Sequence, residues 1–190
     1  VVTARVERIG LATLYLGDCR EIAPALERPA AVISDPPYGI DHGNGGGFSA
    51  SHGWRQTREA VAWDRERPPE EWLRWLGGAS DRVALWGGNY FADCLPPSMG
   101  WLIWDKGQID FSLADVEMAW TNRQQAARRL TLPRAGLVAE GGAHPTQKPV
   151  GVMRFTIDKL KVPPGGAILD PYMGSGSTGV AAVQMRHPFI

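Results

Sequence analysis

The chain has 190 residues, of which 44% are hydrophobic, so it is long enough to bury the core of one domain. Its 20 basic and 20 acidic side chains give no net charge, so any contact with a nucleic acid would have to come from a local basic patch. Two cysteines, Cys19 and Cys94, are too few and too distant for a disulfide framework or a zinc site. Without a run of about 18 apolar residues or an apolar leader, we expect a soluble, cytoplasmic protein with no membrane span.

Short apolar runs alternate with amphipathic helical stretches along the chain. We predict strands over 12–16, 30–34, 82–86, 101–104, 116–120 and 167–169, and the start of a further strand at 188–190. We predict helices over 20–26, 69–76, 150–160 and 177–185. This alternation indicates an α/β fold, with a mostly parallel sheet covered by helices on both faces, in a single domain over 1–190.

Two segments lack such a pattern. The first, 42–53, is rich in glycine, serine and asparagine. The second, 121–142, has no clear strand periodicity and belongs to a basic stretch, because four arginines and no acidic residue occur between Met118 and Ala139. We consider these arginines either phosphate-binding residues or a solvated charged face: Arg123, Arg128, Arg129 and Arg134.

The first motif that carries chemistry follows the predicted strand 30–34: Asp35, Pro36, Pro37 and Tyr38. The prolines stiffen the backbone and remove two N–H donors, which leaves a carboxylate, bare carbonyls and an aromatic ring close together. Such a set suits a flat ring that bears an amino group, since the oxygens accept its N–H bonds and the tyrosine stacks on the ring. A proline-capped strand end with an incidental tyrosine is the alternative.

The second motif runs from Ile168 through a glycine-rich turn to Gly179 and predicts a strand, a turn and a helix. Its glycines would let a ligand approach the backbone, and the helix N-terminus favours an anionic group. A dinucleotide pyrophosphate or the carboxylate of an amino-acid-bearing nucleoside would satisfy this arrangement, and a plain tight turn remains an alternative. No lysine occupies the position that a phosphate-binding P-loop requires. The candidate ligand-binding residues are Asp170, Pro171, Gly174, Ser175, Gly176, Ser177 and Thr178.

The third motif, His144 to Pro149, precedes the predicted helix 150–160. Thr146 could cap that helix and Lys148 could reach a carboxylate. Two further runs end in aromatic residues, around Trp86 and Trp104, which either rim a pocket or, more commonly, pack in the core.

Together, these motifs resemble the DNA amino-methyltransferases. Asp35–Tyr38 resembles their catalytic motif, and 169–178 resembles their S-adenosylmethionine loop. The segment 144–150 resembles the one that precedes that loop. The segment 17–21 resembles an opening element whose acidic residue lies beside the cofactor. The order, with the catalytic motif first and the cofactor loop last, resembles the permuted β-group and implies a Rossmann-like methyltransferase fold. The short segment 121–142 would then be the target-recognition region.

The resemblance implies that S-adenosylmethionine methylates the N6 amine of adenine in double-stranded DNA after the base is flipped out of the helix. In this mechanism Asp35 and the Pro36 carbonyl accept the amine N–H bonds and Tyr38 stacks on the base. The cofactor residues implied are Asp18, Cys19, Asp35 and Lys148, together with the loop residues named above. A homodimer, a cognate restriction endonuclease and a bacterial or phage origin are compatible with this resemblance, and no metal is expected.

Three alternative functions remain open at this point. N4-cytosine methylation is the nearest, although that subgroup usually has serine at the position of Asp35. A non-catalytic DNA-binding subunit that retains the methyltransferase fold is the alternative from another class. An NAD-dependent dehydrogenase would depend on the three glycines Gly174, Gly176 and Gly179 alone, and the acidic residue usually found about 20 positions further on would fall beyond Ile190.

Overall fold

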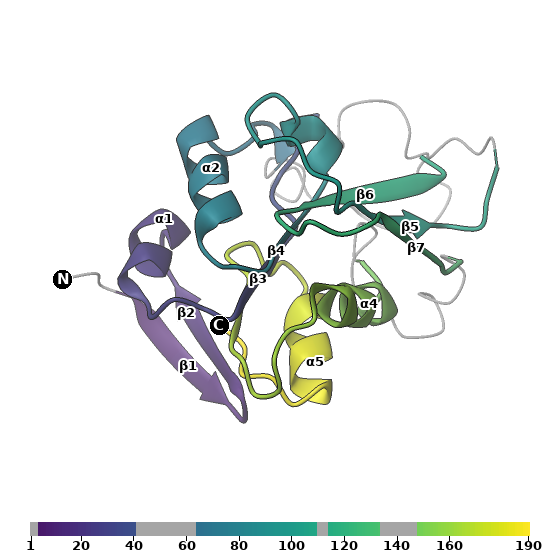
Figure 1. The fold of residues 1–190 in the computed structure, drawn as a ribbon. Helices are drawn as coiled ribbons and strands as arrows, with labels where there is room; N and C mark the ends of the chain where they lie inside the picture. Colours follow the sequence, from purple (N-terminus) through teal and green to yellow (C-terminus); the bar gives the residue numbers. More distant parts are fainter. Residues whose placement is uncertain (1–3, 41–63, 110–113, 134–147) are drawn as a thin grey trace, which may run out of the picture.

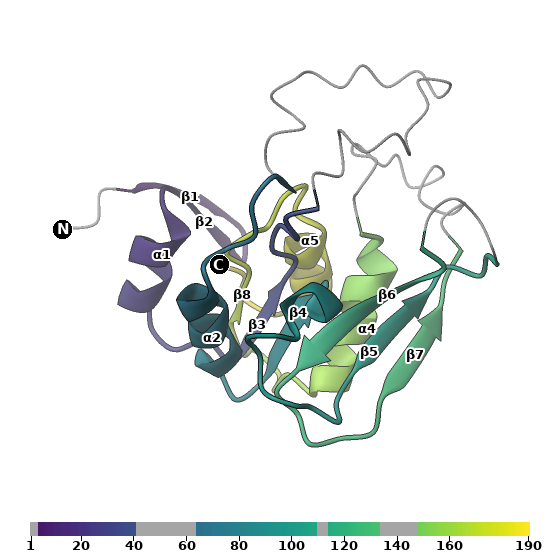
Figure 2. The ribbon, with the colours of Figure 1, turned by 90° about the horizontal axis from the view of Figure 1, so that it is seen from above.

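A central sheet organises the computed structural model, which describes residues 4–40, 64–109, 114–133 and 148–190. Six strands lie in the order β7-β5-β6-β4-β3-β8 (Figure 1; β8 is labelled in Figure 2). Their bounds are β3 Ala31–Ser34, β4 Val83–Trp86, β5 Leu102–Asp105, β6 Val116–Thr121, β7 Arg128–Thr131 and β8 Ile168–Leu169. Strands β8, β3 and β4 are parallel, β5 and β7 are parallel, and β6 is antiparallel to both β4 and β5. The prediction of a mostly parallel sheet is confirmed.

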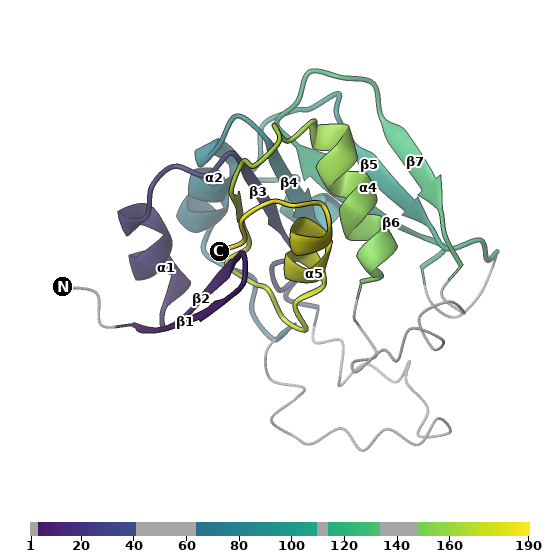
Figure 3. The same cartoon turned by 90° about the horizontal axis from the view of Figure 1, so that it is seen from below.

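Helices cover both faces of this sheet, as the sequence predicts. Helices α4 (Val150–Leu160) and α5 (Ser177–Gln184) lie side by side on one face (Figure 3). Helix α2 (Glu70–Gly78) lies on the opposite face, near the 3-10 helix η4 (Gly88–Phe91) (Figure 2). Because both faces are covered, the short strands β3 and β4 are apolar and buried almost throughout rather than alternating with polar residues.

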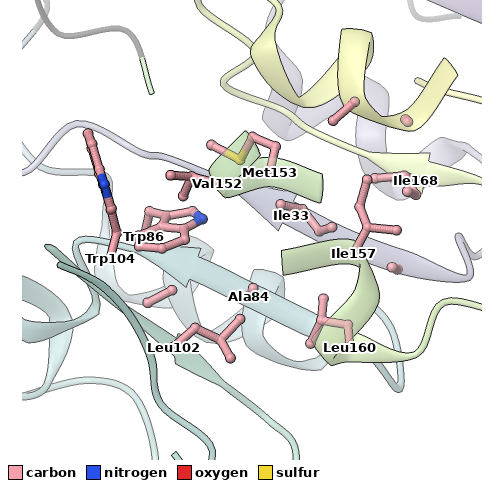
Figure 4. Close-up of a cluster of buried hydrophobic side chains, with 14 of the residues drawn as sticks. Ile33, Ala84, Trp86, Leu102, Trp104, Val152, Met153, Ile157, Leu160 and Ile168 are labelled. Carbon is pink, nitrogen blue, oxygen red and sulfur yellow. The ribbon is translucent and has the colours of Figure 1, made fainter. Parts of the chain in front are cut away.

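Strand alternation divides the core into two clusters. Ala31 and Ile33 of β3 face the cluster that contains α4 and α5, whereas Val32 faces the cluster that contains α2. Figure 4 shows the first cluster, with Trp86 and Trp104 packed beside residues of α4. These two tryptophans are at most 1% exposed, so the packing role that we considered for them is confirmed.

The last three residues extend the sheet beyond β8. Phe189 forms parallel bridges with Ile168 of β8 and with Ala12 of the hairpin made by β1 (Arg5–Ile9) and β2 (Ala12–Leu16). Backbone hydrogen bonds from Thr13 to Phe189 and from Phe189 to Leu11, 2.8 and 2.9 Å long, attach the hairpin to this segment. Where we predicted the start of a strand at 188–190, the structure has isolated bridges at Phe189, and the hairpin lies on that side of the sheet.

Most of the predicted elements agree with the observed ones to within a few residues. Helix α1 (Cys19–Ile22) and the 3-10 helix η1 (Ala23–Ala25) together replace the single helix predicted over 20–26. Strands β1 and β7 were not predicted. Pro149, whose ring fixes φ at −58°, is the N-cap residue of α4, and Thr146, which we suggested as a cap, lies outside the described residues.

Among the described helices, none has the length and apolar character needed to span a membrane. The two cysteines, Cys19 and Cys94, are free, in agreement with the expectation that they form no disulfide framework.

Candidate active site

Two of the predicted motifs meet where β3 and β8 end, which we call the carboxyl edge of the sheet. The parallel register pairs Ala31 with Ile168 and Val32 with Leu169, so the segments that follow the two strands leave the sheet side by side. Ser34 donates a 2.6 Å hydrogen bond from its hydroxyl to the Asp170 carboxylate. The Asp-Pro-Pro-Tyr motif and the glycine-rich turn are therefore neighbours, although 136 residues separate Ser34 and Asp170 along the chain.

Asp35 has a separate short contact on each carboxylate oxygen. The Tyr38 hydroxyl donates to Oδ1 at 2.5 Å, and the Lys148 ammonium contacts Oδ2 at 2.5 Å. The Asp35 side chain is 28% exposed, so it is also accessible from outside the protein. A carboxylate offers about four lone-pair positions, and Asp35 can therefore accept further N–H donors while these two contacts persist.

The ring of Tyr38 is packed between protein side chains. Tyr90 stacks on it with ring centroids 4.8 Å apart and an interplanar angle of 15°, and Phe91 meets it edge-on. Gly87 lies directly against the ring, because a Cβ at this residue would fall 2.0 Å from Tyr38 Cε1. In this structure Tyr90 occupies one face of the ring that we expected to stack on a ligand, and the hydroxyl orients the Asp35 carboxylate.

Asp64 fixes the backbone that follows the motif. Its carboxylate accepts hydrogen bonds from the backbone N–H groups of Tyr38 at 2.6 Å and of Gly39 at 3.2 Å. Asp64 is buried and lies 26 residues after Tyr38, so nothing in the local sequence around the motif indicated this contact. Of the two prolines, Pro36 is buried and Pro37 is half-buried.

Lys148 lies at the Asp35 carboxylate, whereas the sequence placed it among the cofactor-binding residues. Its ammonium also lies 3.0 Å from the Tyr38 hydroxyl and 3.1 Å from the Glu117 carboxylate. Burial alone would lower the pKa of Lys148, but Asp35, Tyr38 and Glu117 raise it well above its usual range. Lys148 therefore remains a cation beside Asp35.

The glycine-rich turn leads into α5 with backbone angles that favour glycine. Gly174 has a φ of 50° and Gly176, the N-cap residue of α5, has a φ of 84°. Ser177 and Thr178, the first residues of α5, are buried. The N-terminal end of the helix is thus built on a short glycine turn, as the sequence predicts.

Asp170 begins this turn and is almost fully enclosed. Burial raises its pKa to about 6, although hydrogen bonds from Ser34, Thr178 and the Tyr172 backbone N–H favour the ionised form. The nearby Asp35 carboxylate raises the pKa further. This electrostatic contact is a second sign that the two motifs lie close together.

A pocket with a cavity volume of about 80 Å³ lies next to the turn, on the side of β2 and α1. Cys19 and Gly17 contribute to its lining from one side, and Asp170, Pro171 and Met173 from the other. The opening element of the sequence and the glycine-rich turn, which are more than 140 residues apart, therefore share one cavity.

Gly17 and Cys19 line this pocket, but Asp18, which lies between them in the sequence, does not. Its carboxylate caps α1 by accepting a 2.9 Å hydrogen bond from the Arg20 backbone N–H and pairs with the Arg20 guanidinium at 2.6 Å. These bonds to Arg20 lower the pKa of Asp18 to about 2, so the side chain is ionised and committed to the helix end. The sequence alone did not show this capping role.

The three predicted arginines that the structure describes do not form one patch. Arg123 follows β6 and donates to the Asp81 carbonyl, just before β4, so it lies at the edge opposite Asp35. Arg128 pairs with Leu102 at the start of β5 and lies toward that same edge. Arg129 extends to Asp105 at the end of β5, 3.5 Å away, and so reaches the carboxyl edge. Arg134 lies outside the described residues, as do residues 144–147 of the third motif.

Known proteins resemble this chain in part of its sequence and in its fold. Residues 102–190 match a family model described as DNA methylase, of the N6/N4 type. The structure is similar to that of M1.HpyAVI in complex with SAM, with a TM-score of 0.56 and 21% identity over 91% of this chain and 88% of that chain. It is also similar to the cytosine-N4-specific PvuII DNA methyltransferase, with a TM-score of 0.57 and 13% identity over 94% and 80% of the two chains. At these identities the similarity establishes the fold, which is Rossmann-like as predicted.

Proposed function

Since its motifs, family match and fold make this protein a β-group-like relative of the DNA amino-methyltransferases, we propose that it methylates the N6 amine of adenine in double-stranded DNA. The methyl donor is S-adenosylmethionine. The observation that carries this proposal is the meeting of Asp35 with the Asp170 turn at the ends of two adjacent parallel strands. This edge is where open α/β sheets bind their ligands.

Asp35 supplies the acceptor that the reaction needs. The exocyclic amine of a base is a poor nucleophile because its lone pair is delocalised into the ring. When the Asp35 carboxylate and the Pro36 carbonyl accept hydrogen bonds from its two N–H groups, the nitrogen becomes more tetrahedral. Its lone pair is then less delocalised into the ring. The same oxygens stabilise the positive charge that develops on the nitrogen as its lone pair attacks the methyl group. The bond between the methyl group and the donor sulfur breaks, which leaves S-adenosylhomocysteine, and the nitrogen loses one proton to the Asp35 carboxylate or to water.

The turn and the neighbouring pocket fit the methyl donor. Backbone N–H groups at the start of α5 suit the carboxylate of its amino-acid part, and Gly174 and Gly176 leave room for a close approach. The pocket beside Cys19 and Pro171 adjoins this turn and is lined by residues of β2, α1 and the turn itself. We assign this pocket to the nucleoside part of the donor. We assign Lys148 a role at the Asp35 carboxylate rather than in binding the donor.

DNA binding is assigned to the carboxyl edge. Arg129 is the phosphate-binding candidate among the described residues, because its guanidinium extends to that edge. Arg134 is a second candidate from the sequence. Arg123 is the poorest candidate, since it lies at the opposite edge of the sheet.

One residue, Asp35, favours adenine over cytosine as the target base. The resemblance to the N4-cytosine enzymes is weakened at Asp35, where they usually have serine. N4-cytosine methylation nevertheless stays a second candidate, because the PvuII enzyme shares this fold.

Nucleoside analysis separates these functions. Unmethylated double-stranded DNA is incubated with the protein and tritiated S-adenosylmethionine, digested to nucleosides and fractionated. Label in N6-methyladenine is the expected result, and label in N4-methylcytosine would identify the second candidate. Protein that binds both DNA and the methyl donor but leaves all nucleosides unlabelled would contradict methyl transfer and favour a non-catalytic DNA-binding subunit.

A further inference from the structure

Glu117 of β6 joins two buried lysines. One of its carboxylate oxygens lies 2.9 Å from the Lys106 ammonium and the other 3.1 Å from the Lys148 ammonium. Lys148 in turn contacts Asp35, so four charges alternate in sign in the order Lys106, Glu117, Lys148 and Asp35. Nothing in the sequence alone linked Glu117 to the candidate active site, and Lys106 was indicated only by its position after a predicted strand.

The burial of both lysines makes Glu117 important for their charge. Their side chains are only 3% and 4% exposed, and each ammonium lies near an aromatic ring, Lys106 near Trp104 and Lys148 near Trp86. A buried cation without an anionic partner is costly and tends to lose its proton. Burial alone would raise the pKa of Glu117, but Lys148 and Lys106 lower it to about 2, so Glu117 is an anion at neutral pH.

We propose that Glu117 is a positioning residue of the active site, which holds the Lys148 ammonium against the Asp35 carboxylate and is itself held by Lys106. This inference rests on the proposed methyl transfer, because Asp35 is the group that it orients. Lys148 fixes one oxygen of Asp35 while Tyr38 fixes the other, and the plane of the carboxylate is thereby set for the incoming amine. Glu117 touches neither Asp35 nor the reacting atoms and acts through Lys148.

The chain of charges predicts a particular dependence on pH. Among the described residues, the ionisable groups that face Lys148 are Asp35 and Tyr38 after β3 and Glu117 on β6, with Lys106 behind Glu117. Replacing Glu117 with glutamine would leave two buried cations with a single anion. Lys148 would then lose its proton at a lower pH, by about 1–3 units, the usual effect of an opposite charge at this distance.

The test compares Glu117→Gln with the double variant Lys106→Met/Glu117→Gln, which removes one charge of each sign. The single-turnover rate of methyl transfer to DNA is measured from pH 7 to 10.5, with protein and donor in excess. The wild-type rate should show no loss from Lys148 over most of this range, because the pKa of Lys148 lies well above its usual value. For Glu117→Gln we expect the rate to fall toward the upper end of the range, with a midpoint about 1–3 units below that of the wild type. The double variant should return this midpoint toward the wild-type value. Glu7→Gln, in an exposed pair with Arg5, serves as a control and should match the wild type.

A Glu117→Gln profile of wild-type shape, whether or not its amplitude is lower, would overturn the proposal. So would a double variant that keeps the full shift. If Glu117→Gln does not fold, Glu117→Asp carries the test, because a side chain shorter by one methylene contacts the lysines less well and should shift the midpoint in the same direction. An unchanged midpoint in that variant would equally overturn the proposal.

A second readout separates this proposal from the proposed function. The Lys148 ammonium is titrated by NMR in protein labelled with ¹³C-lysine, which requires no methyl transfer. Failure of the proposed function would appear as no labelled nucleoside from the wild type, whatever the titration shows. Failure of the positioning role would appear as a Lys148 titration midpoint that is the same in the wild type and in Glu117→Gln.

Discussion

At the scale of single residues, Gly87 sets the position of Tyr38. Its φ of 72° is unfavourable for any other residue, and the space where a Cβ would lie is filled by the Tyr38 ring. The stacking of Tyr90 on the ring and the edge-on contact of Phe91 leave the ring little freedom to shift away. Gly87 therefore acts on Asp35 through the Tyr38 hydroxyl.

We predict that Gly87→Ala reduces both stability and methyl transfer. Gly10→Ala is the matched control, since Gly10 has a φ of 58° but no atom within 4 Å of its added Cβ. The control should lose about 1–2 kcal/mol of unfolding free energy from the backbone angle alone and keep its activity. Gly87→Ala should lose more, because it adds a collision with Tyr38. Urea unfolding and single-turnover rates check both, and equal effects of the two substitutions would contradict this account.

Asp170 gives a prediction about stability and pH. Its pKa is raised from 3.8 to about 6 in the folded protein, so the stability contributed by its protonated form is present below about pH 4 and is lost as the pH rises through about 6. The shift corresponds to roughly 3 kcal/mol. Asp170→Asn keeps an oxygen that can accept from Ser34 and the Tyr172 N–H, but it carries no charge at any pH.

We therefore expect Asp170→Asn to gain stability relative to the wild type as the pH rises from about 4 to 7. The gain should approach 3 kcal/mol and then stay constant. Urea unfolding at several values of pH measures it directly. A difference between the two proteins that does not change with pH would mean that Asp170 titrates normally.

At the scale of elements, β1 and β7 show what the sequence pattern missed. Every residue of β1 is exposed, and β7 has the sequence Arg-Arg-Leu-Thr with a single partly buried residue, Leu130. Both lack the alternation of buried and exposed side chains that reveals most strands. Strand β7 lies at the end of the sheet, where charged side chains are common because they discourage pairing with other chains.

The position of β7 also divides the basic stretch. Because β6 is antiparallel to β4, it carries the chain back to the edge opposite Asp35, where Arg123 lies, and β7 returns it toward the carboxyl edge. Arg129 and Arg123 are six residues apart in the sequence but belong to different edges. Charge density along the sequence could not distinguish them.

We predict that Arg129→Gln weakens DNA binding and that Arg123→Gln, its matched control, does not. Loss of one phosphate contact should reduce the slope of log affinity against log salt concentration by about one. The slopes are measured with the same DNA duplex at several salt concentrations. Equal slopes for Arg129→Gln and the wild type would remove Arg129 from the interface.

At the scale of the whole molecule, the sequence was sufficient to predict the position of those site residues that directly follow a strand. Asp35 and Asp170 each come directly after a buried apolar run, and the ends of such runs meet at one edge of a parallel sheet. Lys106 also follows a predicted strand, but its ion pair with Glu117 was not evident from the sequence. Asp64 and Glu117 could not be found in this way, because each reaches the site through a contact between distant segments.

The role of Lys148 illustrates the same limit. Its position before α4 was evident from the sequence, and so was its ability to reach a carboxylate. Which carboxylate it would reach depended on how α4 packs against β3 and β4. Only the fold shows that this carboxylate is Asp35.

The central claim is that the Asp35 carboxylate, beside the bound methyl donor, accepts the amine of a DNA base. Asp35→Ala tests it most directly, with Asp81→Ala as the control, since Asp81 is an exposed carboxylate before β4. Donor affinity is measured by calorimetry and methyl transfer by single-turnover incorporation into DNA. We predict that Asp35→Ala binds the donor as the wild type does but transfers methyl groups on the order of 10²-fold more slowly or worse, while the control is unaffected. Turnover by Asp35→Ala within a few-fold of the wild type would contradict the account.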